Sequence, residues 1–300
     1  MKQQALYQKA DTLILNVFSA NRPVIPTSAT ITLYKTDGNG VLQAAATASV
    51  DATTGQMSYS LTTTHTATLG LNYKAVWAYI VNGTTYYETQ LWDVVRSKLS
   101  IPITDDDLYA ELPSLRKANL QDRGTATAGS SSTLTDTLKR KEVDDYWKGG
   151  KLEIYSGTGS GQTRDITGFV QSTAVISVTP NFVTTPDTTS LYRVVKSFAD
   201  AIQNGFDKIE NMLYNKGQRD SLILEASQIR IPLIYLVLHT ICMDFREEKD
   251  DRWDILQAEY KDKFNEAFNT LTLDYDADES GGVQGEEQQA AINTIRILRS

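Results

Sequence analysis

Alternating hydrophobic and polar positions dominate the first hundred residues. Residues 29–35 (ATITLYK) alternate strictly, and residues 73–81 (YKAVWAYIV) form a longer run of aromatic and β-branched residues. Turn signals separate such runs, DGNG at 37–40 and Asn82-Gly83 further on. Short strands with turn residues between them predict an N-terminal β-sandwich domain over residues 1–100.

Three large aromatic residues, Trp77, Tyr79 and Trp92, lie in these predicted strands. Burial in the core of the sandwich is the simplest role for them, because aromatic side chains bring a large apolar area. A carbohydrate-binding platform is the alternative role.

The pattern changes after Ile101. Thr104 is followed by three aspartates at 105–107, a capping hydroxyl and then acids at the positive end of a helix dipole. We therefore place the first helix of a helical domain in residues 101–123. Strand patterns return over 124–196, so a second small β module is predicted as an insertion in that domain.

Apolar residues recur with helical period from 197 to 275. Three helices are expected there, over 198–214, 221–245 and 252–271, burying one another as a bundle. The side chains chosen to represent these inward faces are Phe206, Ile209, Leu236, Trp253 and Phe264. Residues 276–300 are expected to be an acidic linker and a C-terminal segment, and the whole chain is expected to be an α+β protein.

The net charge of −8 and the pI near 4.9 argue against a protein that binds nucleic acid by neutralising phosphates. An acidic wall instead suits a conduit along which DNA slides. The single cysteine, Cys242, excludes an intrachain disulfide. The N-terminus lacks the apolar run of a signal peptide, and no run of about 18 uninterrupted apolar residues is present. We expect assembly in the cytoplasm and no membrane partner.

Each chemical motif has a simpler structural interpretation. The glycine-rich residues 157–161 lack the lysine of a phosphate loop, which favours a hairpin turn. His239 and Cys242 give only two metal ligands on one apolar helix. No Ser/His/Asp set can be nominated, so neither enzymatic activity nor a cofactor is expected.

A weak calcium candidate remains near the C-terminus, formed by Asp274, Asp276, Asp278 and Glu286. The spacing departs from a calcium loop, because Glu279 and Gly285 occupy the positions where glycine and glutamate are required. A solvated acidic linker is therefore the preferred interpretation of this segment.

Three stretches of the sequence resemble parts of known proteins. The segment 147–169 (WKGGKLEIYSGTGSGQTRDITGF) looks like a β module that recurs in phage structural proteins. The segment 92–115 resembles the junction of a β domain with helices in phage neck proteins. The C-terminal helices ending in LTLDYDAD resemble those of head–tail connectors, so the three stretches together resemble the bacteriophage head–tail connector (adaptor or neck) family.

The resemblance implies a homo-oligomeric ring, commonly a dodecamer, docked below the portal protein and contacting a stopper or tail-completion protein. This ring would be formed by the helices of the bundle, represented by Phe206, Ile209, Leu236, Trp253 and Phe264. DNA would pass through the lumen without specific binding, and fibres are a further possible partner. By position and character, the C-terminal segment would anchor in the portal through Ile292, Ile295, Leu298 and Arg299. A tail fibre or receptor-binding (fibre-attachment) protein is the alternative, and a bacterial surface protein that binds glycans is a third hypothesis.

Overall fold

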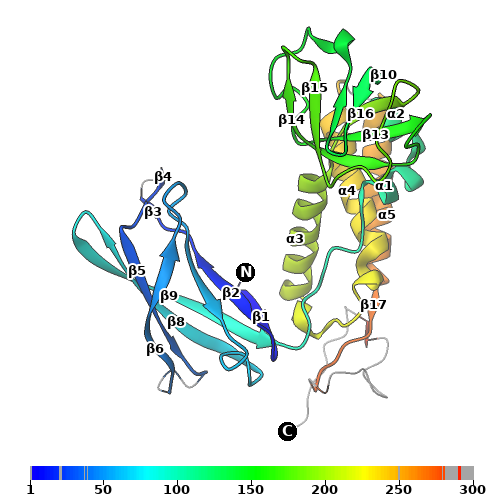
Figure 1. Ribbon diagram of the computed structural model, residues 1–300. Coiled ribbons are helices and arrows are strands. Elements are labelled where there is room, and N and C mark those ends of the chain that lie inside the picture. Colours follow the sequence, from blue (N-terminus) through cyan, green and yellow to red (C-terminus); the bar gives the residue numbers. More distant parts are fainter. Residues whose placement is uncertain are drawn as a thin grey trace. The chain divides into compact units, whose positions relative to one another are not determined.

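The computed structural model is a mixed α and β protein with two large sheets and several helices (Figure 1). It describes residues 2–19, 22–36, 38, 40–248, 251–278, 280 and 290–291. The chain divides into two compact units. Unit 1 comprises Met1–Ser100, Glu210–Gln228 and Thr270–Ser300, and unit 2 comprises Ile101–Ile209 and Ile229–Asn269.

Unit 1 is built on a seven-stranded sheet with the order β1-β9-β8-β5-β6-β7-β2. Its strands are β1 (Gln3–Leu6), β2 (Asp11–Leu15), β5 (Ser28–Tyr34), β6 (Val41–Val50), β7 (Met57–Leu61), β8 (Gly70–Val81) and β9 (Thr84–Val95). Two short pairs lie outside it, β3 (Phe18–Ser19) with β4 (Arg22–Pro23), and β17 (Thr272–Leu273) with β18 (Ala290–Ala291).

The sheet curls around one core. Side chains from β2 and β7, at one end of the strand order, share a hydrophobic cluster with side chains from β8 and β9 near the other end. The predicted burial of Trp77, Tyr79 and Trp92 is confirmed, at 0%, 6% and 0% exposure. The sequence analysis did not identify β6, because its alanine- and threonine-rich sequence lacks the large apolar residues that mark a strand.

Two glutamine side chains join the ends of this curled sheet. The amide oxygen of Gln3 in β1 accepts a hydrogen bond from the backbone N–H of Ile14 in β2, at 3.0 Å. The amide nitrogen of Gln90 in β9 donates to the carbonyl oxygen of Ile14, also at 3.0 Å. Side chains thus satisfy backbone groups of edge strand β2 that no strand covers.

Unit 2 contains the second sheet, of order β10-β16-β13-β14-β15-β12-β11. Its strands are β10 (Leu120–Thr125), β11 (Ala128–Gly129), β12 (Thr133–Thr135), β13 (Gly150–Ser156), β14 (Thr163–Val170), β15 (Val175–Thr179) and β16 (Leu191–Lys196). Only Ala126 and Thr127 separate β10 from β11, although the two strands lie at opposite ends of the order. The backbone N–H of Ala126 donates to Ser190 and that of Thr127 to Thr135, so the sheet closes on itself.

Helices precede and follow this sheet in the chain, as the sequence analysis expected. They are α1 (Asp105–Glu111), α2 (Pro113–Ala118), α3 (Ala199–Asn215), α4 (Arg230–Phe245) and α5 (Arg252–Asn269). The predicted helix start is confirmed, since the backbone N–H of Thr104 donates to the Asp107 carboxylate at 2.7 Å. Pro113 ends α1 and opens α2 at its first position, where a missing N–H costs nothing.

Among the described residues, the stretch Ala226–Phe245 is long and apolar enough to cross a membrane by length and composition alone. Half of it is buried by the rest of the protein. The core helix of a bundle meets the same criterion, and α4 packs closely against α5.

Gly205 sets the approach of α3 to α4. A Cβ atom at this position would lie 2.7 Å from Val237 Cγ2 and 3.3 Å from Leu233 Cδ1. We expect Gly205→Val to lower the free energy of unfolding by about 2 kcal/mol, because a packed interface cannot absorb the added volume. The exposed neighbour Asn204→Val is the control in denaturant unfolding, and equal effects of the two substitutions would contradict this role of Gly205.

Candidate functional site

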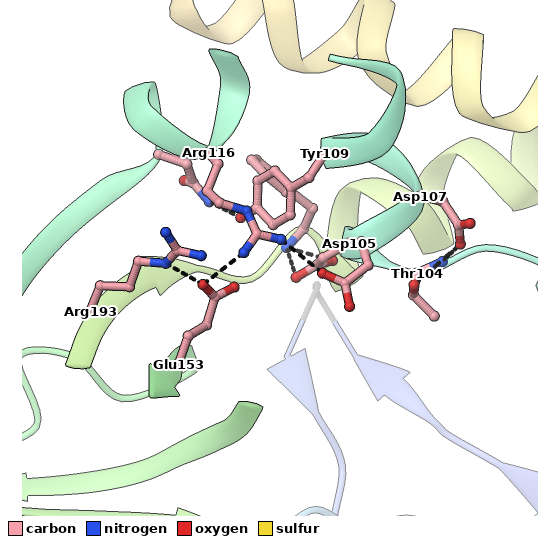
Figure 2. Close-up of polar contacts among 10 residues, drawn as sticks. Thr104, Asp105, Asp107, Tyr109, Arg116, Glu153 and Arg193 are labelled. Carbon is pink, nitrogen blue, oxygen red and sulfur yellow. Dashed lines mark hydrogen bonds and ion pairs between the residues drawn. The ribbon is translucent and has the colours of Figure 1, made fainter. Parts of the chain in front are cut away.

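A cluster of polar side chains lies in unit 2 where α1, α2, the closed sheet and the start of α3 meet (Figure 2). We call it the polar clamp. Its members are Asp105, Asp106, Tyr109, Arg116, Asn119, Glu153 and Arg193. Together they tie the two ends of the inserted β module to the helices on either side of it.

Glu153 is the centre of the clamp. It lies in β13 directly across from Arg193 in β16, and its side chain is only 7% exposed. One carboxylate oxygen, Oε2, accepts hydrogen bonds from Arg193 Nε and, at 3.0 Å, from Arg116 Nη1. A buried carboxylate requires such partners, because removing its charge from water costs several kcal/mol.

Arg116 carries the connection from the sheet to the helices. Its second terminal nitrogen donates to Asp106 Oδ1 at 3.0 Å, and its guanidinium lies 4.4 Å from the ring centroid of Tyr109. The planar guanidinium can make these contacts together because its donors form a fixed fork while its face stacks on an aromatic ring. One side chain therefore links α1, α2 and β13.

Tyr109 and Asn119 form the buried end of the clamp. The Asn119 amide nitrogen donates to the Tyr109 hydroxyl at 2.9 Å and to the Lys196 carbonyl at 2.8 Å. Burial raises the pKa of Tyr109 to about 12, so its hydroxyl is neutral at physiological pH. Asn119 precedes β10 and Lys196 ends β16, so this contact holds the two ends of the module together.

Asp105 extends the clamp to α3. Both of its carboxylate oxygens lie 3.3 Å from the backbone N–H of Phe198, just before α3 begins. Burial raises the pKa of the Asp105 carboxyl above its ordinary value. The start of α1 and the start of α3 are thus fixed to each other.

The clamp is suited to positioning. Each of its carboxylates accepts a hydrogen bond or ion pair from within the protein, and it fixes a β module on a helical frame. Of these residues the sequence analysis named Asp105 and Asp106, as acids at the start of a helix, and it did not name the partners that they meet here. The signal for Glu153 and Arg193 was a single charge inside an apolar strand, with Glu153 between Leu152 and Ile154 and Arg193 beside Val194.

The residues chosen for the ring-forming helices lie in the protein interior. Phe206, Ile209, Leu236 and Phe264 are at most 7% exposed, while Trp253 is half-buried with its ring 5.1 Å from that of Phe245. The four buried side chains hold the helices in place. A contact between subunits would therefore use other side chains of the same helices, and ring formation stays a prediction.

The C-terminal candidates fall largely outside the described residues. This holds for the portal-anchoring residues Ile292, Ile295, Leu298 and Arg299, and for the calcium candidate Glu286.

The aspartates of the calcium candidate lie before and within a local turn at residues 277–278. Asp276 is buried, and both Asp276 Oδ1 and Asp278 Oδ1 accept a hydrogen bond from the backbone N–H of Ser280, at 2.9 Å. The backbone N–H of Asp274 donates a hydrogen bond to the side-chain oxygen of Gln228, at 3.1 Å. No group of three His, Cys, Asp or Glu side chains placed to hold a metal ion occurs in the part of the chain that the structure describes.

The two histidines have structural partners. His239 Nδ1 lies 3.0 Å from the Gln257 carbonyl and links α4 to α5. His65 Nδ1 accepts from the Thr62 N–H at 3.0 Å, and burial lowers its pKa. Burial also raises the pKa of the Cys242 thiol to about 12, which makes it an inert core residue.

Comparison with models of known protein families gave no match, and no characterised protein matches the sequence significantly. The functional argument therefore depends on the residues and their geometry.

Removing the charge at the centre of the clamp should destabilise unit 2. Glu153→Gln leaves Arg116 and Arg193 without their shared carboxylate, and both side chains are about one third exposed or less. We expect a loss of about 2–3 kcal/mol in denaturant unfolding, with faster proteolysis near residues 120 and 196. Asp165→Asn breaks the exposed Lys151 ion pair and should cost under about 1 kcal/mol. Equal losses would show that the clamp is no more important than a surface pair.

The raised pKa of Asp105 predicts a pH effect. The folded state retains the proton to higher pH than the unfolded state, so this carboxyl favours folding below the ordinary value of 3.8 and loses that contribution as the pH rises. The midpoint temperature of thermal unfolding of Asp105→Asn should therefore rise relative to that of the wild type as the pH increases above about 4. Asp200→Asn, at an exposed position in the first turn of α3, controls for removing a charge from a helix start. A constant difference across that range would contradict the assignment.

Proposed function

We propose that this chain is a structural protein of a bacteriophage virion, a head–tail adaptor. In this proposal copies of the chain form a ring at the neck, below the portal protein, joining the capsid to a stopper or tail protein while DNA passes through the lumen. The chain acts through its contacts with other proteins and has no catalytic role.

The distribution of charge is the observation that carries the proposal. Residues 197–300 hold 20 acidic and 11 basic residues, a net charge of −9, whereas residues 1–196 hold 17 acidic and 18 basic residues, a net charge of +1. Residues 197–300, which comprise the helices after the β module, the turns between them and the C-terminal segment, therefore hold the whole negative balance of the chain. A wall that repels phosphates lets DNA slide past without being held.

The outer face of α3 suits such a wall. Its buried residues form one stripe. Its exposed positions carry mostly carboxylates and amides, at Asp200, Gln203, Asn204, Asp207 and Asn211, together with one basic residue, Lys208. Neither a carboxylate nor an amide neutralises a phosphate as lysine or arginine does. This face is our candidate for the lining of the lumen.

The polar clamp and the closed β module add a second line of support. A subunit of a ring must present its contact surfaces at fixed angles, because small errors accumulate around the ring and prevent closure. The clamp fixes the module on the helices at both of its ends. This rigidity and the resemblance to connector proteins favour a ring subunit over a fibre protein.

The experiment is to measure the mass of the purified full-length chain, alone and with the portal protein of the same phage genome, by mass photometry and negative-stain microscopy. We expect a ring that docks on the portal, with a mass of about 400 kDa for a dodecamer of the 33.3 kDa chain. A trimer would favour the fibre-attachment alternative. A monomer that neither docks on the portal nor occurs in the neck of purified particles would overturn the proposal.

A further inference from the structure

Strand β9 leaves one stretch of sheet edge open in unit 1. Its residues pair with β8 from Thr84 to Val94, but β1 covers the other side only from Trp92 to Val95. No described strand pairs with residues 84–89 on that side. The β8–β9 hairpin is the longest of the domain (Figure 1).

The direction of the backbone groups on this edge follows from one hydrogen bond. The N–H of Tyr7 donates to the carbonyl oxygen of Val95 at 2.8 Å, so Val95 directs its backbone groups toward the β1 side. These directions alternate along a strand, so residues 85, 87 and 89 also point outward. The Asn82-Gly83 turn agrees, because both residues have positive φ, as a two-residue hairpin turn of the primed type requires.

The side chains along the open edge are aromatic and nearly uncharged. Tyr86 and Tyr87 are 48% and 73% exposed, and Glu88 is the only charged residue between Thr84 and Thr89. Tyr86 stacks on the buried Tyr79 with ring centroids 5.9 Å apart, on the core-facing side of the sheet. No lysine, proline or bulge blocks the stretch, although natural proteins use these features to protect edges.

Two other edges contrast with this one. Gln3 and Gln90 cover backbone groups of β2, and the strand formed by β10 and β11 closes the sheet of unit 2. Residues 41–48 of β6 also lack a described strand on the β7 side, but they include no aromatic residue. Exposed aromatic residues on a free edge next to a strand that already pairs there are typical of a site for strand addition.

We propose that residues 84–89 bind an extended segment of another protein by antiparallel or parallel strand addition, in line with β1. The outward N–H and C=O groups of Thr85, Tyr87 and Thr89 would supply the hydrogen bonds. The segment carries a basic residue that pairs with Glu88, flanked by apolar residues that cover Tyr86 and Tyr87. This site goes beyond the adaptor role and does not depend on ring formation.

The test is a titration of the isotope-labelled full chain, followed by backbone amide NMR signals, with an octapeptide of alternating threonine and valine carrying one central lysine. We expect shifts centred on residues 84–89. The same peptide with glutamate in place of lysine should bind about threefold more weakly, as expected for a reversed cross-strand charge pair.

Two variants at one position separate binding from folding. Thr89→Pro removes an outward N–H but no bond to β8, so the fold should be retained and peptide binding lost. Thr89→Ala should bind as the wild type does. Absence of shifts at residues 84–89, equal binding by the proline variant, or a homodimer that already protects these amides would overturn the proposal, whatever the outcome of the ring measurement.

Discussion

The ion pairs that Glu153 shares with Arg116 and Arg193 are the constraint on which the arrangement of unit 2 depends. A closed β module has no edge with which to attach itself to helices, so its position must come from side chains at its base. A buried carboxylate bonded to two guanidiniums fixes that position. If either arginine moved away, the buried charge would lose a partner, and this would destabilise the folded state. Tyr109, Asn119 and Asp105 extend the same constraint to the first and third helices.

The two large sheets differ in how the backbone groups at their edges are covered. In unit 2 a bent strand closes the sheet, whereas in unit 1 glutamine side chains cover one edge strand and leave part of β9 open. A free edge with exposed tyrosines is a liability for a protein that works alone. In a protein whose work is to hold other proteins, the same edge is a means of attachment, which links the proposed strand-addition site to a structural role.

Charge and rigidity together give the adaptor proposal its physical content. Residues 197–300 hold the negative balance of the chain, and residues 1–196, which contain the two large sheets, are close to neutral. A neutral part suits contacts between proteins, because desolvating unpaired charges opposes association. An acidic part suits a passage for DNA. The two proposed roles, contact with other proteins and lining of the DNA passage, follow from where the charges lie in the sequence. The polar clamp holds the β module of unit 2 in a fixed position on its helices.

Local sequence patterns determined most of the elements. Alternation predicted the long strands that pack Trp77 and Trp92, helical period predicted α3, α4 and α5, and the Thr104 cap with Pro113 marked where α1 starts and ends. These features depend on neighbours in the chain, so a sequence shows them directly. Strand β6 was not predicted, because its alanine and threonine residues show little alternation between large apolar and polar side chains. The tertiary structure alone decided the partners of Glu153, the glutamine bridges to Ile14 and the exposure of the β9 edge. Each of these features depends on residues that are distant in sequence. No local pattern shows which strand edge stays unpaired or which arginine binds a buried carboxylate.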